Sequence, residues 1–171
     1  MGLLLKTWWK RDEGATAVEF SLVGFPFVLM TIGILEMALM FTSQSMLQEA
    51  TFTASRLIRT GQIQQAGGTE TMFRDAVCGF AELLIPCSRI QFQVQQLPSF
   101  SDADDMPPVF DADGNLTDTP FDPGVENDVV LVRVVYNYPI RTPLMKPVLS
   151  NATGGKRTMI STIVLQTEPY E

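Results

Sequence analysis

An apolar run at residues 20–41 constrains this chain more than any other feature of its sequence. Within its 22 residues only Glu36 is ionisable. As a helix the run would extend about 33 Å, at roughly 1.5 Å per residue, which is enough to span the hydrocarbon core of a bilayer. We therefore predict a transmembrane helix at residues 15–45, continuing as an amphipathic helix to about Arg59.

The basic residues before this run predict its orientation. Lys6, Lys10 and Arg11 precede it, and Lys or Arg next to a first span favours a cytoplasmic N-terminus. The acidic remainder of a chain with a formal charge of −7 would then face the periplasm. An ordinary cleaved signal peptide is one alternative, but its apolar region should be only about 7–15 residues long. A bitopic anchor that is never cleaved is another.

A short motif opens the run: Gly14, four small or apolar residues beginning with Ala15, then Glu19 and Phe20. It resembles a type IV prepilin-class signal, and most of all that of Flp-type pilins and TadE-like pseudopilins of tight-adherence systems. The resemblance implies that residues 1–14 are a leader, which a membrane prepilin peptidase removes by cutting between Gly14 and Ala15. It also implies that Glu19 and Phe20 contribute to assembly with other subunits.

The two acidic residues of this region need a physical reason. A carboxylate near the centre of a bilayer is unfavourable by about 2.5–3.5 kcal/mol, and by less near an edge. Cleavage after Gly14 would create an ammonium at Ala15, one helical turn from Glu19, and the two charges would relieve each other's burial. The amine could instead come from a neighbouring subunit. Alternatively, Glu19 is a charge that simply lies at the membrane interface. Glu36 is either an intramembrane contact with another subunit or a group that reaches the outer interface or pairs locally.

The remaining residues, 46–171, predict one exported α+β domain. Apolar residues at helical spacing favour a second helix at residues 69–84, with Thr69 as N-cap and Pro86 close behind its end. Alternating or apolar runs predict strands at residues 90–95, 128–138 and 156–166. A small antiparallel sheet packed on the helices is the simplest arrangement. Residues 98–128 hold nine acidic residues, five prolines and no Lys or Arg, which predicts an irregular exposed loop.

Two cysteines, Cys78 and Cys87, bear on the compartment of this domain. An exported domain permits a disulfide, and this one would close a loop of about ten residues and contribute about 2–3 kcal/mol. Two free thiols are an alternative. A metal site is a weaker one, because such a site needs about four ligands and the chain has no histidine.

The second half of the chain extends the resemblance. The segments that carry it are Asp122-Pro123-Gly124, the run from Val129 to Tyr136, Pro139, and Thr142-Pro143-Leu144. They look like the carboxy-terminal part of TadE-like proteins, and the two cysteines fit the same pattern. The chain is too short to resemble TadG-like proteins, which carry a large additional domain.

The acidic loop also contains a partial calcium motif. Asp111, Asp113, Asn115 and Asp122 offer oxygen ligands at spacings similar to those of a calcium loop. The match is flawed, because Leu116 stands at the sixth position where glycine belongs, and the twelfth residue is Asp rather than Glu. An Asp-Gly turn in a solvated loop is the simpler interpretation.

Several function classes are disfavoured by what the sequence lacks. There is no histidine, no P-loop, no GxGxxG, and no Ser or Cys nucleophile with a recognisable base. An acidic chain with a pI of about 4.5 also does not suit nucleic acid. We therefore expect no enzymatic activity and no cofactor. The expected function is that of a pseudopilin-like assembly component of a tight-adherence pilus, in the bacterial inner membrane or incorporated in the extracellular pilus. Its expected partners are the prepilin peptidase, other pilin or pseudopilin subunits and the inner-membrane machinery. An uncleaved anchor that presents a periplasmic binding domain is the alternative.

Overall fold

The computed structural model describes residues 13–82 and 84–170, and these residues confirm the predicted α+β class. The chain forms two compact units, with the boundary between Ala38 and Leu39. A single long helix, α2 (Glu13–Arg59), supplies all the described residues of the first unit and also begins the second. Its predicted extent, from Ala15 to about Arg59, agrees with the observed one to within two residues at the start.

Polar and helix-breaking residues are accommodated inside α2 in the first unit. Pro26 lies within the helix rather than ending it, as expected for a helix that needs to lose only one backbone hydrogen bond. The hydroxyls of Ser21 and Thr31 donate to the carbonyls of Ala17 and Phe27, four residues earlier. These two hydroxyls are therefore satisfied without water, which suits an apolar environment.

The second unit contains a three-stranded antiparallel sheet in the order β1-β2-β3. The strands are β1 (Ile90–Leu97), β2 (Val129–Pro139) and β3 (Lys156–Gln166). Ile90 pairs with Tyr136 in the first ladder, and Val129 pairs with Gln166 in the second. The predicted bounds of β3 match those observed, and β1 runs two residues further than the alternating pattern indicated.

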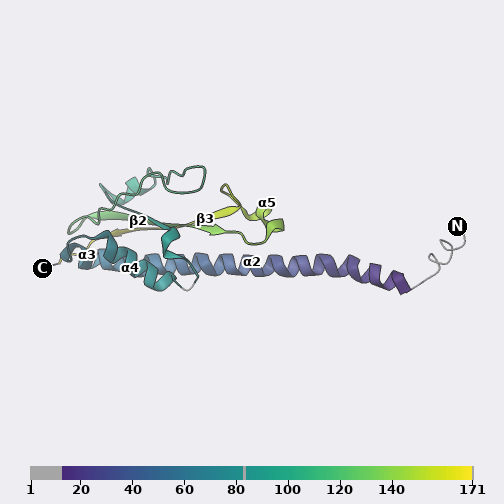
Figure 1. Ribbon diagram of the computed structural model, residues 1–171. Coiled ribbons are helices and arrows are strands. Elements are labelled where there is room, and N and C mark those ends of the chain that lie inside the picture. Colours follow the sequence, from purple (N-terminus) through teal and green to yellow (C-terminus); the bar gives the residue numbers. More distant parts are fainter. Residues whose placement is uncertain (1–12, 83, 171) are drawn as a thin grey trace, which may run out of the picture. The chain divides into compact units, whose positions relative to one another are not determined.

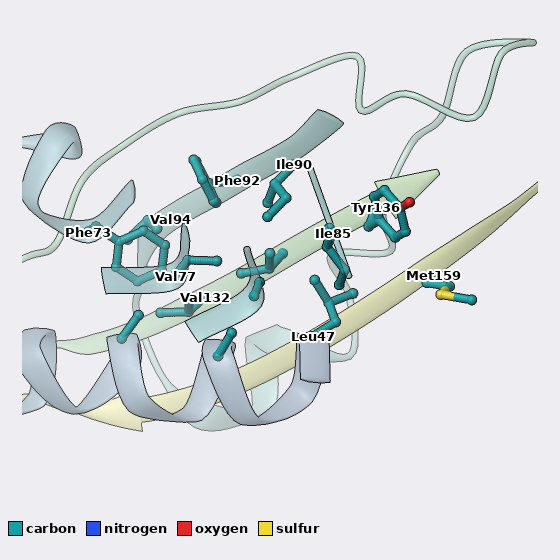
Figure 2. Packing of buried hydrophobic residues seen from close by; sticks show 14 of the residues in the cluster. Leu47, Phe73, Val77, Ile85, Ile90, Phe92, Val94, Val132, Tyr136 and Met159 are labelled. Atoms are coloured by element: carbon teal, nitrogen blue, oxygen red, sulfur yellow. The ribbon is translucent and has the colours of Figure 1, made fainter. Parts of the chain in front are cut away.

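One face of the sheet packs on helices to form the main core (Figures 1 and 2). Leu47, Ala50, Ala54 and Ile58, at helical spacing on α2, are fully buried. The helix α4 (Glu70–Ala81) adds Phe73, Val77 and Ala81. The facing strand residues alternate along each strand; in β1 they are Ile90, Phe92 and Val94. The spacings of 3.6 and 2 residues thus bring both sets of side chains to one interface.

The helices between α2 and β1 differ from the prediction in two respects. A short helix, α3 (Gln62–Gln65), forms where the sequence indicated only a break. Helix α4 ends at Ala81 rather than at residue 84, and Thr69 occupies its N-cap position without a side-chain capping bond. The early end follows from the next residues, because Ile85 turns into the core and Cys87 returns to Cys78.

The acidic segment 98–128 is mostly exposed and irregular, and it also covers the second face of the sheet (Figure 1). Leu116 is buried, and Ala103 packs against the buried cluster of this second face. Phe121 instead packs against the main core and forms a parallel bridge with Val94 at the edge of β1. Polar side chains of β1 hold the segment, since Gln91 accepts from the Leu116 N–H at 2.7 Å. Central strand β2 is therefore covered on both faces, which explains its continuous apolar sequence.

The remaining elements are short. They are the 3-10 helices η1 (Cys87–Arg89), η2 (Phe100–Ala103) and η3 (Pro143–Met145), and the one-turn helix α5 (Lys146–Leu149). The last two lie in the connection between β2 and β3.

Candidate functional site

The predicted processing and assembly residues all lie in the first two turns of α2. Gly14 and Ala15 are helical, and Glu19 and Phe20 follow within the same helix. Phe20 is 78% exposed and Glu19 is also exposed. Glu19 follows Ala15 by four positions, which places the backbone nitrogen of Ala15 about one helical turn from the carboxylate of Glu19. Residues 1–12 of the predicted leader lie outside the described residues.

The surface of α2 in the first unit is apolar. Large exposed side chains there include Phe25, Phe27, Met30 and Leu35. Among the described residues, one helix is long and apolar enough to cross a membrane, by length and composition. Contiguous exposed apolar surface of this kind marks contact with lipid or with other protein helices. The finding fits a membrane-anchored protein.

The two acidic residues of the apolar region differ in exposure. Glu19 is exposed and forms no ion pair among the described residues. Glu36 is only 5% exposed. Of these two carboxylates, Glu19 is therefore the more accessible.

The predicted disulfide between Cys78 and Cys87 is present. It joins α4 to η1, and the two Cα atoms are 5.4 Å apart, which is within the usual range for a disulfide. Neither cysteine is free. The bridge fixes the turn that delivers Ile85 and Ile90 to the core.

The structure does not gather the calcium candidates into a site. The Asp111 carboxylate accepts from the N–H groups of Asp113 and Asn115, at 2.9 and 2.8 Å. These bonds, led by the one from the Asn115 N–H, hold the pKa of Asp111 below its usual value. Asp122 caps a separate turn by accepting from the Gly124 N–H at 3.0 Å. Within residues 13–82 and 84–170, no group of three or more acidic, Cys or His side chains could hold a metal.

Asn115 instead links the acidic segment to the sheet. Its side-chain oxygen accepts from the amides of Gln91 and Asn137, each at 3.0 Å. Its side-chain amide donates to Asp111 at 3.1 Å. The Asn115 side-chain oxygen, which a calcium site would use as a ligand, is therefore already hydrogen-bonded to β1 and β2.

A buried arginine was missed by the sequence analysis. Arg133, in the middle of β2, is 3% exposed. Its guanidinium donates to the Gln93 side-chain oxygen and, at 2.8 Å, to the Met106 carbonyl. Burial lowers the pKa of Arg133, although an arginine stays charged. A single cation in an otherwise apolar strand was the available signal, and in the structure it ties β1, β2 and the acidic segment together.

Comparison with known proteins gives one family. Residues 14–56 match the family model described as TadE-like protein. No curated protein and no solved structure matches the chain. The matched residues begin at Gly14, contain Glu19 and the exposed apolar part of α2, and end within the helical part of the second unit.

Proposed function

Because the match at residues 14–56 supports a TadE-like protein of tight-adherence pilus systems, we propose that this chain is a pseudopilin-like assembly subunit of such a system. In this proposal a prepilin peptidase cuts between Gly14 and Ala15, and the apolar stem remains in the inner membrane with the second unit in the periplasm. The observation that carries it is the coincidence of three features at one place: the first matched residue, the glycine of the prepilin-like motif and the start of the exposed apolar helix.

In this role the protein binds other subunits and catalyses no reaction. The peptidase cleaves the chain, and the chain provides the surfaces that contact lipid and other subunits. Its stem presents Phe20, Phe25 and Phe27 to lipid or to neighbouring stems. The second unit, with its covered sheet and disulfide, remains folded outside the membrane and contacts other subunits of the assembly.

Glu19 supplies the charged contact in this proposal. The amine created at Ala15 lies a turn from the Glu19 carboxylate of the same chain, or meets the Glu19 of a neighbour. In an environment of low dielectric each charge lowers the cost of burying the other. The exposure of Glu19 leaves it accessible to either amine.

We expect Gly14→Leu to block processing, because a bulky side chain at the cleavage position obstructs entry into a peptidase site. The intact mass and N-terminal residue of protein from the native membrane measure this directly. Unsubstituted protein should begin at Ala15 when the host's prepilin peptidase is present and near Met1 when it is deleted. Gly14→Leu should retain the leader in both hosts.

Gly24→Leu is the matched control for this experiment. A Cβ atom added at Gly24 would have the Phe20 ring as its nearest neighbour, at an ordinary contact distance of 3.6 Å, so this variant should be processed normally. Unsubstituted protein that keeps its leader in a host with active peptidase would support the permanent anchor and refute the proposed processing.

We expect Glu19→Gln to be processed normally and to assemble poorly. A hydrogen bond to a charged group contributes about 1.5–3 kcal/mol, so its loss should reduce co-purification with the other pilus subunits by about tenfold or more. Glu70→Gln, which removes the exposed Arg74–Glu70 pair on α4, is the control and should assemble normally. Equal assembly of the two variants would exclude the charged contact at Glu19.

A further inference from the structure

Strand β3 is an edge strand with an open outer edge. Even-numbered residues of β3 direct their backbone groups away from β2, since the Ile160 carbonyl accepts from the Gln44 side chain at 3.0 Å. Beyond the strand, Glu168 N–H donates outward to the Arg59 carbonyl, while Thr167 N–H donates inward to Asp128. Between these two outer contacts, the outward N–H and C=O groups at residues 162, 164 and 166 have no hydrogen-bond partner in the described part of the chain.

The middle of the opposite edge of the sheet is covered by the chain itself, at Val94. On β1, the Val94 N–H donates to the Pro120 carbonyl and the Val94 carbonyl accepts from the Asp122 N–H, both at 2.8 Å. Proteins cover edges in this way because an open edge recruits another strand. The covering segment interrupts the β1 edge at its centre, whereas no such segment interrupts the outer edge of β3 between residues 162 and 166 in the described part of the chain.

A groove of about 910 Å³ runs along the open edge, between β3 and the C-terminal part of α2. Phe52 lines it and is 65% exposed, although it lies beyond the apolar run of the stem. Ser55 also lines it, is 3% exposed, and has a hydroxyl oxygen that is buried without a hydrogen-bond partner. A buried unsatisfied hydroxyl is unfavourable, so this oxygen indicates a missing partner group.

Charged side chains lie on either side of Phe52 along this surface. Arg56 lines the groove and is exposed, and Glu49 lines an adjoining pocket that shares Phe52 and Ile163 with it. Neither residue belongs to an ion pair among the described residues. The two residues are seven positions apart on the helix, or about 10 Å, which corresponds to about three residues of extended chain.

We propose that the groove and the open edge of β3 together bind an extended segment of a different pilus subunit, which adds a fourth strand to the sheet. The backbone of this segment pairs with residues 162, 164 and 166, as in other cases of strand addition. Its side chains on the α2 side include an apolar residue against Phe52 and a polar residue that bonds to Ser55. An acidic residue faces Arg56 and a basic residue faces Glu49. This inference rests on the proposed function for the class of partner.

A second copy of this chain does not fit the same edge. Strand β3 runs in the same direction as α2, because Gln44 meets Ile160 and Arg59 meets Glu168. Antiparallel pairing of two β3 strands would therefore point the two α2 helices in opposite directions, which two copies anchored in one membrane cannot adopt. Parallel pairing requires a shift of one residue between the strands, and a two-fold axis cannot generate that shift.

Photo-crosslinking of the full chain in its native membrane tests the inference. A benzophenone amino acid at Gln166, on the open edge, should crosslink to an extended segment of another pilus subunit, identified by mass spectrometry of the joined peptides. The same probe at Gln96, an exposed position on β1, is the control and should give at least about fivefold less adduct. Equal yields at the two positions, or a joined peptide from this chain itself, would overturn the proposal.

A proline at Val164 separates backbone pairing from general contact. Val164→Pro removes an outward N–H while leaving the bonds to β2 intact, because proline is tolerated at the open side of an edge strand. Val164→Ala loses the same apolar side chain and keeps the N–H. The Gln166 adduct should fall about fivefold or more in Val164→Pro, as expected for loss of an edge bond, and remain within about twofold in Val164→Ala.

Two further measurements keep the result interpretable. The thermal midpoints of the two Val164 variants report whether both are folded, and Arg56→Glu gives an independent variant, expected to reduce the adduct without touching the sheet. An adduct that survives both Val164→Pro and Arg56→Glu overturns the inference. The N-terminal residue is read in the same samples. Processing at Ala15 without an adduct refutes strand addition alone, whereas an adduct from unprocessed chain refutes the proposed processing and retains strand addition.

Discussion

Phe73→Ala is expected to lower the free energy of unfolding of the second unit by about 3–5 kcal/mol. Phe73 is fully buried on α4. Its ring packs edge-on against Phe92 of β1, with centroids 5.5 Å apart, and lies 5.8 Å from Phe121 of the acidic segment. The substitution therefore opens a cavity where a helix, the sheet and the covering segment meet. Domains of this size are stable by only about 5–15 kcal/mol, so the loss is a large fraction of the total.

Urea unfolding of the full chain in detergent, followed by the near-ultraviolet signal, measures this effect. Phe80→Ala is the matched control, because Phe80 is on the same helix but 45% exposed. It should change stability by less than about 1 kcal/mol. Similar losses in the two variants would show that Phe73 does not occupy a packed core.

Removing the disulfide is expected to have the second largest effect. The double substitution Cys78→Ala with Cys87→Ala should lower stability by about 2–3 kcal/mol, because the bridge restricts a loop of about ten residues in the unfolded chain. The substitutions act on the same α4–β1 connection that Phe73 helps to anchor. Thermal unfolding with and without a reductant measures the change.

The double variant is itself the control for the effect of the reductant on thermal unfolding. Reductant should lower the midpoint of the unsubstituted protein toward that of the double variant and leave the double variant unchanged. A midpoint that is insensitive to both reductant and substitution would mean that the bridge does not contribute to the stability of the folded unit.

The sequence predicted the elements whose pattern is repetitive. The apolar run and the amphipathic spacing through Ile58 define α2, and the apolar residues between 159 and 165 indicate β3, which lies between Gly155 and Thr167. The end of α4 was wrong by about a turn, because the turn at Ile85 is set by packing and by the disulfide rather than by local preference. The disulfide itself was predicted from compartment and spacing.

The position of the acidic segment on the sheet could not be predicted from the sequence. Its composition correctly indicated an irregular, exposed stretch, yet the contacts that place it join residues far apart in the chain. Gln91 reaches Asn115, and Arg133 reaches Met106. Polar residues in loops carry no periodic signal for such contacts. The contact proposed for Glu19 would likewise be a property of an assembly, so the motif predicts a role for this residue and does not identify a partner.

The unequal connections of the sheet have a consequence for the order in which it forms. Residues 98–128 separate β1 from β2, whereas the shorter stretch 140–155 separates β2 from β3. Closing the roughly twofold longer connection is less favourable by about 0.6 kcal/mol, so we expect the β2–β3 hairpin to form before β1 joins it. Until β1 pairs with β2, the acidic segment 98–128 lacks the Gln91 contact that holds it, and Arg133 lacks its contact with Gln93. The most apolar strand of the protein then has one unpaired side, which makes this stage of folding the one most exposed to pairing with a wrong chain.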